Sequence, residues 1–185
     1  MFRSILKLAG APAMLMALGS TSVIAQSDLL VSPFIAFHSS GSATRFAGLA
    51  LTLGAGSGLS IRGSGHLALN GTTRSVVGSG TDRPWAADAD AVMSFGGHSF
   101  SGLRSVAPFA FAGIGTSGAS TQNYESRRSN WSYGAGANVP LAGAIDLFGE
   151  ARWRMSEFVL PTAADSPSPT TEFRAGLTFH VGGGR

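Results

Sequence analysis

The chain has 185 residues, with 13 Lys and Arg against 10 Asp and Glu, and it contains no cysteine. The lack of cysteine excludes a disulfide framework, a thiolate metal site and a cysteine nucleophile. Only 12% of the residues are charged, whereas about a quarter is usual for a soluble domain. We therefore expect something other than water to cover much of the surface.

The N-terminal segment has the pattern of an export signal. Arg3 and Lys7 precede an apolar run over residues 8–19, which is too short to cross a bilayer. Small or modest residues then lead to Ala25, where we predict cleavage by a signal peptidase. The expected organisation is a signal peptide over residues 1–25 and one domain over residues 26–185.

Removal of this segment changes the charge balance. Arg3 and Lys7 leave with the signal, so the mature domain keeps 11 arginines, 10 acidic residues and no lysine, a net charge of +1. A near-neutral domain of this kind has no basic patch for phosphates, which argues against a nucleic-acid partner.

Eight later stretches alternate between apolar and polar or small residues with a period of two, the pattern of strands with two different faces. In chain order they are residues 31–38, 45–56, 58–70, 85–95, 105–115, 130–141, 144–155 and 171–181. Most are about 9–12 residues long, which is the length that a tilted strand needs to cross a bilayer. No stretch has the 18 consecutive apolar residues of a transmembrane helix.

The connections between these stretches alternate in length. Residues 54–58 and 141–144 form short joints, and residues 96–104 form a moderate one. The other side has a first loop at 39–44 and three longer polar loops at 70–84, 117–129 and 156–170. Short turns on one side and longer loops on the other are typical of outer-membrane barrels. We predict an all-β fold, an eight-stranded antiparallel up-and-down transmembrane β-barrel in the outer membrane.

The charged residues of four predicted strands lie on one face of each strand, while Leu, Ala, Gly, Phe and Val occupy the other. Four positive and five negative charges suit a closed lumen, where a charge is tolerated only if it is paired. Arginine suits this role because its planar guanidinium holds carboxylates with two hydrogen bonds. The predicted lumenal network is Arg62, Asp88, Asp90, Asp146, Glu150, Arg152, Arg154, Glu172 and Arg174.

The aromatic residues give an independent indication of the same arrangement. With the N-terminus in the periplasm, all three tryptophans fall at the extracellular ends of their strands with outward parity, and Tyr133 follows one step below. Tyr and Trp favour the boundary between membrane and water. The predicted extracellular girdle is Trp85, Trp131, Tyr133 and Trp153. A looser periplasmic belt is predicted at Phe95, Phe109 and Phe179.

Three alternatives remain open at this stage: a secreted soluble lipocalin-like binding barrel with the faces exchanged, a small channel, and an outer-membrane lipid-modifying enzyme. His38 and Ser40 share a strand face about 7 Å apart, but no deacylase-like motif surrounds them. The four histidines have no ligand-like spacing, and Asp88 and Asp90 are expected to pair with arginines rather than with a cation. We predict no enzyme, no catalytic residue, no cofactor and no metal site.

Two segments, APFAFAGIGTSG at 107–118 and NWSYGAGANVPLAGAIDLFGEARWR at 130–154, resemble the PY-x-x-x-G-x-G and GAG-x-x-x-PL…E-x-R stretches of the bacterial outer-membrane β-barrel domain family. These are the small OmpA/OmpX-like eight-stranded barrels. The resemblance implies contact with outer-membrane lipid and lipopolysaccharide, insertion by the barrel-assembly machinery, and a structural or surface-interaction role. The ligand of the surface loops stays unknown.

Overall fold

The computed structural model describes residues 29–39, 44–54, 58–70, 83–96, 106–120, 125–156 and 170–181. The predicted signal peptide lies outside these residues, as do most of the predicted long loops. Within the described ranges no helix is long and apolar enough to cross a membrane.

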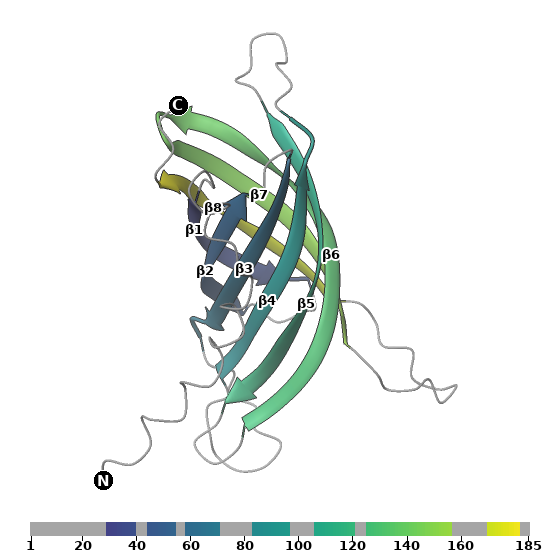
Figure 1. Cartoon of the computed structure of the whole chain (residues 1–185). Helices are drawn as coiled ribbons and strands as arrows, with labels where there is room; N and C mark the ends of the chain where they lie inside the picture. The colour runs from purple at the N-terminus through teal and green to yellow at the C-terminus, as the bar shows by residue number, and fades with distance from the viewer. Residues whose placement is uncertain are drawn as a thin grey trace.

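Eight antiparallel strands close into a barrel in chain order, and β1 also pairs with β8 (Figure 1). They are β1 (Leu29–His38), β2 (Arg45–Gly54), β3 (Leu59–Ala68), β4 (Arg83–Ser94), β5 (Ala107–Ser120), β6 (Glu125–Ala142), β7 (Ile145–Ser156) and β8 (Thr170–Val181). The predicted eight-stranded up-and-down barrel is confirmed, and each predicted strand overlaps one observed strand.

The hairpin of β5 and β6 extends further than the sequence predicted. Pairing continues to Ser120 and Glu125, so most of the loop predicted at 117–129 is strand. Its residues, SGAS at 117–120 and ESRRS at 125–129, show no apolar alternation. Main-chain hydrogen bonds of the ladder continue through this ribbon, and a pattern of apolar side chains does not reveal them.

The barrel has two ends, which we name by what they carry. The terminal end holds the start of β1 and the end of β8, paired as Leu29 with Val181. The loop end is opposite and holds His38 of β1 and Arg83 of β4. The long connections of the sequence leave from the loop end, and the two-residue turn between β6 and β7 lies at the terminal end.

Side chains alternate between a buried interior and an exposed apolar exterior. On β2, Leu49 and Leu51 are 48% and 47% exposed, whereas Ala50 and Thr52 between and beside them are buried. The largest exposed fraction among the exterior hydrophobics is that of Ile114, at 69%. This is the reverse of a soluble barrel, in which the large apolar side chains fill the interior.

The lumen nevertheless contains aromatic side chains that the sequence reading placed elsewhere. Phe109, expected in an outward belt, is only 4% exposed and packs with Phe111 and Val92 inside. The prediction for Phe109 is wrong because β5 is apolar on both faces, so its alternation does not show which face is inward. A second lumenal cluster contains Phe34, Ala36, Phe46, Ala50 and Phe148.

Four of the lumenal phenylalanines are each paired with a glycine on a neighbouring strand. The pairs are Phe34–Gly48, Phe34–Gly176, Phe109–Gly136, Phe111–Gly134 and Phe148–Gly176. A Cβ atom added at Gly134 would collide with the Phe111 ring and with the carbonyl of Ala151. Glycine is thus required at these inward positions to leave room for the rings.

Candidate functional site

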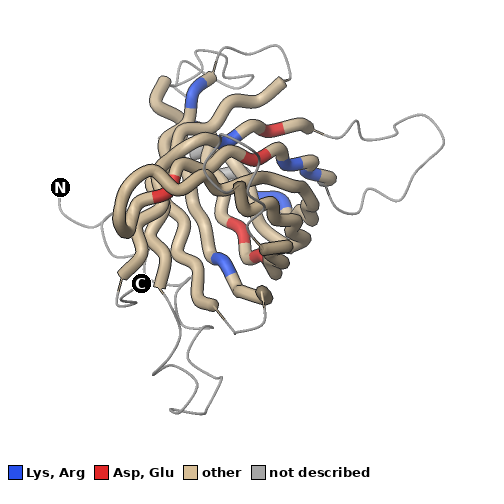
Figure 2. Tube along the Cα trace, turned by 90° about the horizontal axis from the view of Figure 1, so that it is seen from above, with Lys and Arg blue, Asp and Glu red and all other residues tan. Residues whose placement is uncertain are grey.

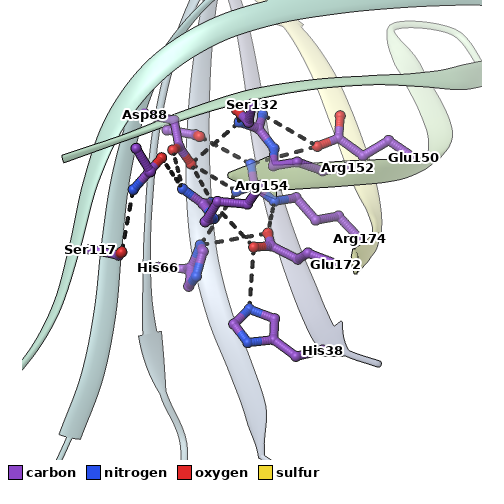
Figure 3. Close-up of polar contacts among 12 residues, drawn as sticks. His38, His66, Asp88, Ser117, Ser132, Glu150, Arg152, Arg154, Glu172 and Arg174 are labelled. Atoms are coloured by element: carbon purple, nitrogen blue, oxygen red, sulfur yellow. Dashed lines mark hydrogen bonds and ion pairs between the residues drawn. The ribbon is translucent and has the colours of Figure 1, made fainter. Parts of the chain in front are cut away.

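Eight of the predicted lumenal charges form one network across the barrel, and Figure 3 shows the part of it around Asp88, Arg154 and Glu172. They come from β3, β4, β7 and β8: Arg62, Asp88, Asp90, Glu150, Arg152, Arg154, Glu172 and Arg174. None of these residues is more than 8% exposed. In a closed ring of eight strands, β3 and β7 lie opposite each other, as do β4 and β8, so the network spans the lumen. In the view from above (Figure 2), acidic and basic positions lie close together on the barrel wall.

The layer nearest the loop end is centred on Asp88. Arg154 holds this carboxylate with two hydrogen bonds of 2.6 and 3.0 Å, and Arg174 adds a third of 3.0 Å. Arg154 also donates to the side-chain oxygen of Asn130 at 2.8 Å and to Glu172 at 3.2 Å. Bidentate arginine–carboxylate pairs of this kind fix orientation as well as providing attraction.

The next layer is centred on Asp90. Arg152 donates to both of its carboxylate oxygens, at 3.1 and 2.6 Å, and to the hydroxyl of Ser132 at 2.8 Å. The Nε of Arg62 donates to Asp90 at 3.1 Å, and a terminal nitrogen donates to Glu150 at 2.6 Å. Each of the two carboxylates at the centres of these layers is therefore shared by more than one arginine.

Aromatic rings pack against the guanidinium groups inside the lumen. Phe111 lies under both Arg62 and Arg152, with the guanidinium carbons 4.6 and 4.5 Å from the ring centre. Phe34 lies 4.7 Å from the guanidinium carbon of Arg174. Four arginines thus face four carboxylates, which leaves the network without net charge.

Asp146, the ninth predicted residue, is buried but lies apart from this network. It accepts a hydrogen bond of 2.8 Å from His180 near the terminal end. The structure thus separates the predicted set into eight residues that meet and one that does not.

Two histidines that the sequence reading did not assign to the site adjoin the network at the loop end. His38 lies 3.2 Å from Glu172 and stacks on Phe46, with ring centres 4.4 Å apart. His66 lies with its Nδ1 3.5 Å from Arg174. His66 shares the inward parity of Arg62 on β3, which was the one available signal. The inward residues that precede His38 on β1, Phe34 and Ala36, are apolar. Nothing in the sequence therefore connected His38 to Glu172.

His38, His66 and Glu172 bring three ligand atoms within 4.8 Å of one another. Two imidazoles and a carboxylate are a donor set that zinc accepts. Here, however, Glu172 already accepts hydrogen bonds from both Arg154 and Arg174. A cation bound to Glu172 would lie beside two guanidinium groups, so the donor set is better suited to ion pairing than to a metal.

The same contacts bear on the catalytic alternative. Glu172 orients His38 as a carboxylate orients a catalytic base, but Ser40, the candidate nucleophile, lies outside the described residues. Among the hydrogen bonds of the described ranges, none joins His38 to a hydroxyl group. Within the described residues, His38 is therefore oriented by Glu172 but has no hydroxyl group as a hydrogen-bond partner.

A cavity of about 60 Å³ opens in the terminal half of the lumen and ends at the network. Its polar lining includes Ser32, Thr52 and Thr178, and its inner end is formed by Arg62 and Glu150. A space of this size holds a few water molecules rather than a solute.

The predicted girdle residues lie on the outer surface toward the loop end. Trp131, Tyr133 and Trp153 form a continuous stack on β6 and β7, with ring centres 5.7 and 5.8 Å apart. Trp85 lies on β4, opposite Leu67 of β3. Trp131 and Tyr133 are 42% and 41% exposed, so their rings present an amphipathic surface outside the barrel.

No protein-family model matches the sequence, and the search of curated proteins found no match. Among solved structures, the N-terminal β-barrel domain of Pseudomonas aeruginosa OprF matches with a TM-score of 0.59 and 12% identity, over 84% of this chain and 99% of that one. The chain has the fold of the eight-stranded outer-membrane β-barrels. Neisserial surface protein A matches this barrel with a TM-score of 0.54 and 15% identity, over 83% of this chain and 94% of that one. The predicted likeness to the OmpA/OmpX-like barrels is confirmed at the level of the fold.

Proposed function

We propose that this chain is an outer-membrane β-barrel with a structural or surface-interaction role and a closed, ion-paired lumen. The observation that carries the proposal is the eight-charge network, which crosses the lumen between opposite strands. Arg152 and Glu172, both 0% exposed, lie within it. Eight strands leave an interior that side chains can fill, so a solute path would require these pairs to separate.

The orientation follows from the exterior. The aromatic stack of Trp131, Tyr133 and Trp153 marks one membrane boundary, and it lies toward the loop end. We assign the loop end to the cell surface and the terminal end to the periplasm, because long loops of such barrels are extracellular. The partners that fit this arrangement are outer-membrane lipid and lipopolysaccharide, with the barrel-assembly machinery inserting the chain.

The alternatives agree less well with the geometry. A soluble binding barrel would expose to water the leucines of β2, which are nearly half exposed. A channel would need a lumen without the ion pairs that cross it. An enzyme would need a nucleophile beside His38, whereas the described contacts of this histidine are with Glu172 and with aromatic rings.

Conductance in planar lipid bilayers tests the closed lumen. We expect the refolded barrel to show no steady conductance, while a porin reconstituted in the same way serves as the positive control. Regular single-channel steps that the folded barrel shows and that heat denaturation abolishes would contradict the proposal. Unaltered lipid A in a deletion strain is the matching expectation for the absence of lipid-modifying activity.

A further inference from the structure

The charges on the outside of the barrel are distributed unevenly. Every carboxylate side chain that the structure describes lies in the lumen: Asp88, Asp90, Asp146, Glu150 and Glu172. Among the charged side chains whose exposure the structure describes, the exposed ones are Arg45, Arg83, Arg127 and Arg128. All four lie at the loop end of their strands. These four arginines therefore place positive charge at the end that we assign to the cell surface.

Two of these arginines flank one part of the outer face. Arg83 lies two residues before Trp85 on β4, and both have the outward parity of that strand. Arg127 lies four residues before Trp131 on β6, again with outward parity. The strand between them, β5, pairs Gly118 with both Trp85 and Arg127. Because glycine has no side chain, the outer surface over β5 is lower here than over its neighbours. The side chains of β4 and β6 rise on either side, from backbones about 10 Å apart.

A hydrogen bond fixes the direction of one arginine. The Nε of Arg127 donates to the hydroxyl of Thr116 at 3.0 Å. Thr116 pairs with Ser129, which lies two residues nearer to Trp131 than Arg127 does. The bond therefore directs the guanidinium along the barrel toward the aromatic boundary, and it occupies Nε rather than the two terminal nitrogens.

The depth of this feature agrees with the headgroup layer. From Leu141 to Trp131, β6 rises about 25 Å at 3.3 Å per residue and a tilt near 40°, which is the height of the apolar band of such barrels. Arg127 lies about 10 Å further by the same calculation, and its bond to Thr116 brings the guanidinium back toward the boundary. The headgroup layer is roughly 5–8 Å thick on each side, so the guanidinium falls within or close to it.

We propose that the trough between β4 and β6, formed by Arg83, Trp85, Thr116, Gly118, Arg127 and Trp131, binds a phosphate group of lipid A in the outer leaflet. The arginines bind the phosphate oxygens, and the tryptophans pack against the sugar and the upper acyl chains. The inference rests on the proposed outer-membrane location and orientation, and it names a specific lipid site within them.

Binding of diphosphoryl lipid A to the refolded barrel in detergent, followed by native mass spectrometry, tests this site. The test variant is Arg83→Gln combined with Arg127→Gln, and the matched control is Arg45→Gln, an exposed arginine at the loop end of β2. We expect the double variant to bind diphosphoryl lipid A at least about tenfold more weakly, a loss equivalent to one charge-assisted contact. The control should bind like the wild type, and the wild-type preference over monophosphoryl lipid A should disappear in the double variant.

Three results would overturn the inference. The first is unchanged binding by the double variant, and the second is an equal loss in Arg45→Gln, which would indicate diffuse charge attraction. The third is displacement of lipid A by inorganic phosphate at the same concentration, since the site would then bind free phosphate. Each variant is first shown to be folded by its heat-dependent gel migration. A wild type without that migration shift would refute the proposed barrel itself, whereas a folded barrel without discrimination refutes only the lipid site.

Discussion

At the scale of single residues, the decisive feature is the burial of charge. Asp88 and Asp90 each accept hydrogen bonds from two arginines. Removing ions from water costs several kcal/mol each, and paired geometry offsets this cost only while both partners are present. The network is therefore expected to be sensitive to the loss of one member and tolerant of the loss of a matched pair.

Glu150→Ala tests this expectation. The substitution removes the 2.6 Å hydrogen bond from Arg62 and leaves one more positive than negative charge in the network. We expect the free energy of unfolding to fall by about 3–5 kcal/mol, as for other buried pairs that lose one partner. Urea unfolding in phospholipid vesicles, followed by tryptophan fluorescence, provides the measurement.

The matched control combines Glu150→Ala with Arg62→Met. Removal of both charges should restore part of the lost stability, and the double-mutant cycle isolates the coupling between the two residues. A single variant as stable as the wild type would contradict the interpretation of Glu150 as a buried partner of Arg62.

At the scale of the strands, the two faces have different environments. The outward leucines of β2 are exposed to the surroundings of the barrel, whereas Ala50 on the same strand is only 4% exposed. In a membrane barrel a charge on the outward face is costly at the middle of the bilayer and much less costly near the interface. In a soluble barrel an outward charge has no such dependence on depth.

Substitution of arginine along β2 distinguishes these two environments. Leu49 lies in the middle of the strand and Leu53 near the terminal end. We expect Leu49→Arg to destabilise the barrel in vesicles by about 2–4 kcal/mol and Leu53→Arg by about 0–1 kcal/mol. Equal and small effects at both positions, measured by the same urea titration, would indicate that water surrounds this face.

At the scale of the whole molecule, closure is the central property. Pairing of β1 with β8 leaves no unpaired edge, and every strand then has two hydrogen-bonded neighbours. A closed barrel in lipid has no partly open form in which its backbone groups stay satisfied. The folded state is therefore expected to resist detergent.

Gel migration of samples from isolated outer membranes tests closure and location together. We expect unboiled protein to migrate differently from boiled protein, because the closed barrel persists in dodecyl sulfate until it is heated. Recovery of the chain in the periplasm, with the same migration before and after boiling, would instead support the soluble lipocalin-like barrel.

The sequence by itself determined the number of strands, their order and the faces of most of them. Alternation with a period of two is a local property, and each of the eight segments carries its own signal. The charges on β4 and β7 were assigned to the inward face for this reason, and the structure places them there. The signal was absent where both faces have the same character, as at Phe109, and where a polar ribbon is held by its backbone, as at 117–120.

Only the tertiary structure decided which of these inward side chains meet. Arg62 contacts Glu150, 88 residues away, and Arg174 contacts Asp88, 86 residues away. His38 reaches Glu172 because closure places β1 beside β8. These contacts depend on the register of the ladders and on which strands oppose each other across the lumen. Neither property is written in any single segment, because both arise only when the eight strands close into one ring.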